Sequence, residues 1–261
     1  MKLKRLFIAS LAVLFISACG SRAYYPSPEE LQEKRERLAK AEAMFQERCK
    51  KAGEFIYRTA ENVEGIFILK LRPKGINYRD QYKMDDPYGS DLDGHGYIET
   101  FLYGKNEKGN LDNNKIGGYG YADAIDPEDG KRYRYTGRMD EPWQRDKSYE
   151  EGYMRFVLDK VPAPGSAPRY GVTYDDISTR EERDYWIAGS SLRVIDLKTN
   201  EVMAERIGYM MDRGQGADSG GRAPWLLAVR NACPELGPHS VSQIHQTRIF
   251  VEKVLHSIKE K

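Results

Sequence analysis

The sequence predicts an α+β domain, mainly an antiparallel β-sheet flanked by an N-terminal and a C-terminal α-helix. A capped, highly charged helical pattern opens the domain, alternating runs rich in Tyr and β-branched residues fill its middle, and an amphipathic pattern closes it. The 261-residue chain is 40% hydrophobic, which suits one buried core. We therefore expect a single domain over residues 28–261.

The first helix is expected from residue 28 to about residue 51. Ser27 is placed to cap it, Pro28 fits its first turn, and Glu30 completes a capping box. A narrow apolar stripe follows, made of Leu31, Leu38, Ala41, Phe45 and Cys49. The stripe favours a helix packed on its own domain over a coiled-coil seam for a partner, because few large residues occupy the positions between.

Runs of strand character occupy the middle of the chain. They cover residues 55–59, 63–71, 97–103, 119–124, 132–138, 153–159, 192–197 and 202–209. The run at 63–71 is almost continuously apolar, which is typical of a central strand covered on both faces. The last two runs predict a hairpin, since they surround a short polar turn that contains Asn200.

Connecting segments are marked by glycine, proline and polar residues. Residues 77–96 form a long polar stretch, residues 162–168 carry three prolines, and residues 214–222 are rich in glycine. The segments 77–96 and 214–222 are long enough to form a site. A final helix is expected from Ser240 to about Lys259, where apolar residues share one face.

A secretory leader precedes the domain. Basic residues at the start are followed by an apolar run over residues 6–18, which is shorter than the roughly 20 residues that a membrane-spanning helix needs. The leader ends in Ile16-Ser17-Ala18-Cys19, which matches a lipobox, so it resembles the signal peptide of bacterial lipoproteins. The resemblance covers the leader alone. An ordinary secreted protein with Cys19 incidental is the alternative.

The resemblance implies that residues 1–18 are removed and that Cys19 carries a diacylglyceryl group and an acyl chain such as palmitate. Two or more chains anchor a protein stably to a membrane. Residues 19–27 would then be the lipidated cysteine and a tether. Because Gly20 rather than Asp follows the cysteine, we expect the outer membrane, with the domain on the periplasmic face.

Cys49 and Cys233 are the two cysteines that remain beyond Cys19. The periplasm is oxidising, so we expect them to form a disulfide that ties the start of the domain to its end.

The charge balance gives no electrostatic case for nucleic acid. Removing residues 1–18 takes away three positive charges and changes the formal net charge from +1 to −2. The basic and aromatic run at 131–135 is therefore interpreted as an exposed strand, with an anionic envelope polymer as the alternative ligand. Tyr is abundant, with 18 copies against 8 Phe, and indicates half-exposed strands or a binding face for sugar or protein.

Two segments resemble known site motifs without completing them. Residues 217–221 resemble the surround of a protease nucleophile at Ser219, but His95 is the only histidine before it and no base motif is present. Residues 91–94, with Asp85, Asp86 and Glu99 nearby, resemble the opening of a calcium loop but lack its later ligands.

The remaining histidines, His239, His245 and His256, do not share a metal-binding spacing. No cofactor, metal or catalytic residue is predicted.

The sequence therefore favours a lipid-anchored envelope protein with a binding or structural role and a protein partner in the envelope. One alternative is an inhibitor or immunity-type lipoprotein that blocks a toxin or a lytic enzyme. Another is an envelope-acting hydrolase whose site is spread over distant residues.

Overall fold

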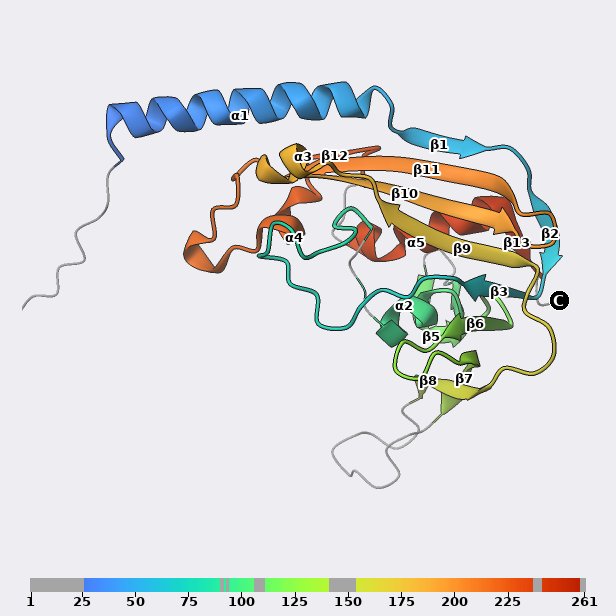
Figure 1. Ribbon diagram of the computed structural model, residues 1–261. Coiled ribbons are helices and arrows are strands. Elements are labelled where there is room, and N and C mark those ends of the chain that lie inside the picture. The colour runs from blue at the N-terminus through green and yellow to red at the C-terminus, as the bar shows by residue number, and fades with distance from the viewer. Residues whose placement is uncertain are drawn as a thin grey trace, which may run out of the picture.

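The predicted first helix is α1 (Pro28–Cys49), and its capping box is present. The Ser27 hydroxyl accepts the Glu30 N–H at 3.1 Å, and the Glu30 carboxylate accepts the Ser27 N–H at 2.7 Å. This computed structural model describes residues 26–89, 92, 94–105, 111–140, 154–236 and 241–258. Only the C-terminal half of α1 packs against the sheet. Ala41 and Phe45 are buried, whereas Leu31 is exposed, so the first turns project beyond the sheet (Figure 1).

A nine-stranded sheet forms the body of the described residues (Figure 1). Its members are β1 (Gly53–Ile56), β3 (Gly65–Ile68), β6 (Tyr121–Ile125), β7 (Arg132–Asp140), β8 (Arg155–Pro162), β9 (Tyr170–Asp176), β10 (Ile187–Asp196), β11 (Glu201–Met211) and β12 (Ala232–Cys233). The order is β1-β11-β10-β9-β3-β6-β7-β8, and β12 also pairs with β11. Two small sheets pair β13 (Leu255–Ser257) with β2 (Ala60–Val63) and β4 (Tyr103–Lys105) with β5 (Leu111–Ile116).

The sheet is mostly antiparallel, as predicted, but its centre is parallel. In the large sheet, β3 runs parallel to both β6 and β9. In the separate small sheet, β13 runs parallel to β2. The central strand predicted at 63–71 is present as the shorter β3, where Ile66 and Ile68 on one face are fully buried and Phe67 on the other face is half-buried. The predicted hairpin is also confirmed as β10 and β11, with Asn200 at a positive φ of 60° in the turn.

The C-terminal helix is shorter than predicted. α5 (Val241–Val254) packs Phe250, Val251 and Val254 into the main core. The expectation that it continues to about Lys259 is wrong, because the next residues leave the helix and pair with β2 as β13. α1 packs on the other face of the sheet, against Ile187 and Tyr209.

The strand predicted at 97–103 is also wrong, since most of it forms α2 (Gly94–Thr100). Tyr97, Ile98, Phe101 and Leu102 are all buried in the main core. Their spacing matches one face of a helix as well as a buried strand, so a short apolar run cannot separate the two. Two further short helices, α3 (Arg180–Asp184) and α4 (Pro224–Ala228), lie near the end of the sheet where β10 begins and β11 ends (Figure 1).

Candidate functional site

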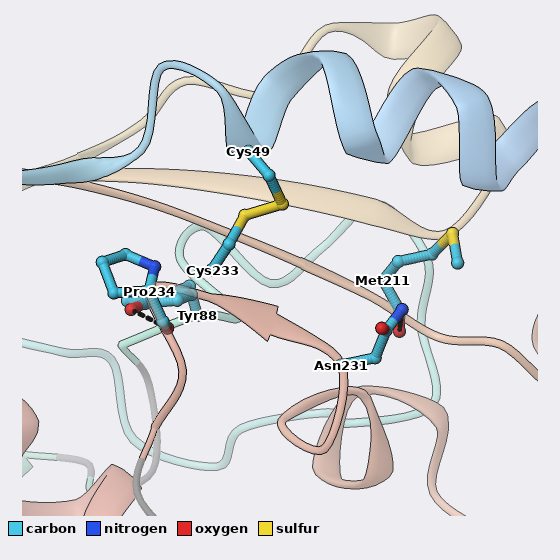
Figure 2. Close-up of a disulfide and its surroundings, with 6 residues drawn as sticks. All are labelled: Cys49, Tyr88, Met211, Asn231, Cys233 and Pro234. Atoms are coloured by element: carbon cyan, nitrogen blue, oxygen red, sulfur yellow. Dashed lines mark hydrogen bonds between the residues drawn. A yellow bond between two sulfur atoms is a disulfide. The ribbon is translucent and has the colours of Figure 1, made fainter.

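The predicted disulfide between Cys49 and Cys233 is present (Figure 2). It joins the end of α1 to β12, across a sequence separation of 184 residues. β12 and β1 lie on the same edge of β11, where Cys233 is opposite Tyr209 and Gly53 is opposite Ile207. The bridge therefore fixes α1 to the edge of the sheet.

Hydrogen bonds on both sides of Cys233 support this clamp. The Met211 N–H donates to the Asn231 carbonyl at 3.0 Å, and the Tyr88 hydroxyl donates to the Pro234 carbonyl at 3.0 Å. Figure 2 shows these residues around the bridge. Cys19, the predicted lipid attachment, lies outside the described residues.

The glycine-rich segment 214–222 is organised around Asp212 and not around Ser219. The Asp212 carboxylate accepts the Gly216 N–H at 2.8 Å and pairs with Arg222, while Ser219 is exposed. His95 lies beside the Tyr135 ring, with ring centroids 5.9 Å apart. Within the described residues, no hydrogen bond joins Ser219 to His95.

The acidic residues near 91–94 have separate partners. Asp85 pairs with Lys70 at 2.9 Å, Asp86 pairs with Arg72 at 2.9 Å, and Glu99 accepts the Tyr103 hydroxyl at 2.7 Å. Asp91 and Asp93 lie outside the described residues. Among those that are described, no group of three His, Cys, Asp or Glu side chains is gathered as a metal site requires.

The structure also places two of the remaining histidines and the basic run at 131–135. His256 pairs with Glu61, burial lowers the pKa of His245, and His239 is not described. In the basic run, Arg134 pairs with Asp123 at 2.8 Å. Tyr135 is fully buried, so this strand is less exposed than the sequence suggested.

A pocket of about 460 Å³ lies where β3 and β6 end. Because these strands are parallel, their carboxyl ends meet, which is where ligands bind in many open sheets. The residues after β3 form one wall, with Leu69 and Leu71, and the end of β6 and the residues that follow it form another, with Ile125 and Pro127. Tyr135 of β7 also lines the pocket. Its walls are mainly apolar.

A hydrogen-bonded turn shapes the β6 side of this pocket. The Asp126 N–H donates to the Lys131 carbonyl at 2.9 Å, and the Gly130 N–H donates to the Asp126 carbonyl at 2.8 Å. The Asp126 carboxylate accepts a bond from Lys160 and another from the Glu128 N–H, and these bonds lower its pKa. The carboxylate is therefore ionised and already paired, unlike the raised-pKa acid that a general-acid mechanism requires.

Arg72 supplies a buried cation on the β3 side. Its guanidinium lies 4.1 Å from the Tyr174 ring centroid and 4.9 Å from that of Tyr97, and Asp86 is its ion-pair partner. Burial raises the pKa of both tyrosines. The two tyrosine rings hold Arg72, and with it the segment after β3, in place, and Asp86 neutralises the charge of Arg72.

The remaining side comes from the start of α2. Gly94 has a positive φ of 43° and donates its N–H to the Arg72 carbonyl at 3.0 Å. A Cβ there would lie 3.1 Å from Lys74 Cγ, so glycine allows this close approach. His95 is exposed, and its side chain has no hydrogen bond or ion pair within the described part of the chain. Its ring nitrogens are therefore open to a ligand.

This arrangement suits a small molecule with an apolar body and a hydrogen-bonding end. The volume lies within the range of small-molecule sites, and apolar walls with a few polar groups are their usual composition. Sequence reasoning missed the pocket, because its residues come from four segments with no shared local spacing. The acidic turn after β6 was not singled out at all.

None of the described helices is both long enough and apolar enough to span a bilayer. Comparison with protein-family models, curated proteins and solved structures finds no match to this sequence.

Proposed function

We propose that this chain is a bacterial envelope lipoprotein with a binding role, whose ligand is a small molecule held in the pocket between β3 and β6. The pocket is the observation that carries the binding role. Lipid on Cys19 would hold the protein at the periplasmic face of the outer membrane, as the lipobox implies.

The shape of the N-terminal region supports an anchored protein. α1 has 22 residues and is therefore about 33 Å long, at about 1.5 Å per residue. Its first turns are exposed, and its far end is clamped to the sheet by the disulfide. The tether at 20–27 adds up to about 29 Å of reach when fully extended. Helix and tether would together hold the pocket away from the lipid.

Charge pairing within the pocket indicates the class of ligand. Asp126 is paired with Lys160, Arg72 with Asp86, and Glu128 with Lys74 at 3.6 Å. Burying an apolar body against the walls would therefore supply most of the affinity. His95 would orient one polar end by a hydrogen bond.

Calorimetric titration with phenylbutyrate tests the pocket. This probe has an apolar aromatic body and one carboxylate, and full-length protein in detergent should bind it saturably. Ile125→Asp should weaken binding at least tenfold, because it places a carboxylate in the apolar wall. Ile125 is exposed enough that the fold should tolerate the change. Leu226→Asp is the matched control, since Leu226 is similarly exposed on α4 and outside the pocket. Equal binding by all three proteins would refute the pocket.

Fractionation of cells tests the anchor separately. Cys19→Ala should move the protein from the membrane to the soluble fraction and abolish incorporation of labelled palmitate. Membrane retention of unlabelled Cys19→Ala protein would contradict the lipid anchor, whatever the result for the pocket.

A further inference from the structure

β1 lies at an edge of the large sheet. It pairs with β11 on one side, and among the described strands none pairs with its other side. Figure 1 shows β1 at the outer edge of the nine-stranded sheet, directly after α1 in the chain. Phe55, Ile56 and Tyr57 are 42%, 41% and 66% exposed, so three large apolar side chains lie on this edge. An exposed edge of this kind can add another strand.

The main-chain groups of β1 are oriented for such pairing. The Tyr57 N–H donates to the Met203 carbonyl of β11 at 2.9 Å, and the Arg58 N–H donates to the same carbonyl at 3.1 Å, so the regular alternation ends with β1 and Arg58 can join a neighbouring strand only through its side chain. Because this orientation alternates along an antiparallel strand, the N–H and C=O groups of Glu54 and Ile56 face outward. Glu54 as a whole is exposed to solvent, whereas its side chain alone is only 28% exposed. Its main-chain atoms are therefore accessible to solvent.

The sequence of this edge is complementary to itself when antiparallel. With Ile56 opposite Ile56 of a second copy, Glu54 lies opposite Arg58, and Phe55 lies opposite Tyr57. Each copy would thus contribute to two ion pairs and two aromatic pairs, both of which stabilise neighbouring strands. The outward main-chain groups of Ile56 also match this register, since directly opposed residues can exchange two hydrogen bonds.

The charged residues keep some capacity for new bonds. Glu54 accepts one bond from Lys253 at 2.6 Å, and a carboxylate has further acceptor positions. Arg58 Nη2 contacts Asp196 at 2.8 Å and Glu201 at 3.5 Å, which leaves the Nε and Nη1 groups of a guanidinium whose side chain is 42% exposed. The intramolecular pairs therefore hold both side chains at the edge without saturating them.

We propose that a second copy of this chain pairs with β1 through antiparallel strand addition centred on Ile56. The two sheets then form one continuous sheet around a twofold axis, with the same surface used by both copies. This inference is independent of the proposed pocket and anchor.

Cysteine crosslinking tests the register in cells that express the full-length protein. Ile56→Cys should give a disulfide-linked dimer on a non-reducing gel after mild oxidation, because the two residues face each other. Val161→Cys is the control, since Val161 is exposed on β8 at the other edge of the sheet. An Ile56→Cys variant that stays uncrosslinked, or that joins a different protein, would overturn the proposal.

Charge reversal provides a second test, by sedimentation of the purified protein. Glu54→Arg and Arg58→Glu should each shift the protein toward monomer, because like charges then face each other across the axis. The double reversal should restore the dimer, since opposite charges are opposed again. Circular dichroism at the sedimentation temperature confirms that each variant is folded. Three folded variants with the wild-type sedimentation coefficient would overturn the register, as would a monomeric wild type.

Discussion

Asp196 links three segments at the end of β10, and its removal should cost measurable stability. Its side chain is fully buried. It accepts hydrogen bonds from Arg169 Nη2 at 2.7 Å, from Arg58 Nη2 at 2.8 Å and from the Lys198 N–H at 3.1 Å. Arg58 follows β1 and Arg169 precedes β9, so one carboxylate ties two separate segments to the β10–β11 turn. We predict that Asp196→Asn loosens all three.

The magnitude follows from the titration of this carboxyl group. Hydrogen bonds from Arg169, then the Lys198 N–H and the charge of Arg58, lower its pKa to about 2 against an ordinary 3.8. A depression of this size corresponds to about 2 kcal/mol of stability for the ionised form. Both arginines are partly exposed and can be hydrated in the variant, so the loss stays below the 3 to 5 kcal/mol typical of a buried charge left unpaired.

Urea unfolding across pH measures this directly. The folded-state pKa is depressed, so the contribution is present above about pH 4 and is lost as the pH falls toward 2. Wild type should exceed Asp196→Asn by about 2 kcal/mol at pH 7, and the difference should shrink below pH 4. Asp175→Asn is the control, since Asp175 pairs with Arg193 and its side chain is 49% exposed. That variant should lose less than about 1 kcal/mol. Equal losses in the two variants, or a pH-independent difference, would refute the reasoning.

Three other changes test separate parts of the fold. Asp86→Ala leaves the buried Arg72 without its ion-pair partner and should cost about 3 to 5 kcal/mol in urea unfolding; a loss under about 1 kcal/mol would contradict this pairing. Replacing Cys49 by Ser opens a loop spanning 184 residues and should cost on the order of 3 to 5 kcal/mol, seen as a lower melting temperature. An unchanged melt would argue against the bridge with Cys233. Ser27→Ala removes the α1 cap and should increase amide exchange in its first turns, at a cost of about 1 kcal/mol; unchanged exchange would show that the cap is dispensable.

The features predicted correctly are those with local signals. The capping box at Ser27 and Glu30 sets the start of α1, and the turn at Asn200 sets the hairpin of β10 and β11. The disulfide followed from cysteine count and the expected compartment, which needs no knowledge of the fold. The predicted leader rests on a local signal of the same kind, and the leader and its lipid anchor both stay predictions.

The features missed depend on contacts between distant segments. β9 was not predicted, although it completes the parallel centre of the sheet beside β3. The segment 77–96 looked like an open loop because it is polar, yet Met84 and Tyr88 are buried in a second core with Trp225. Sequence spacing does not reveal which distant segments a buried aromatic will contact.

The pocket was missed for the same reason. Leu71, His95, Ile125 and Tyr135 come together only because β3 and β6 run parallel and α2 begins beside their ends. Composition and periodicity describe each of these segments alone. Their convergence is a property of the topology.

Native mass spectrometry of the full-length protein, purified in detergent from the cells that express it, tests the central claim most directly. Wild type and Leu226→Asp should both retain a small molecule as an added mass that gas-phase activation releases. Ile125→Asp should lack that mass, because its carboxylate enters the apolar wall of the pocket. The same spectrum from all three proteins, whether bare or carrying the same adduct, would contradict a ligand held between β3 and β6.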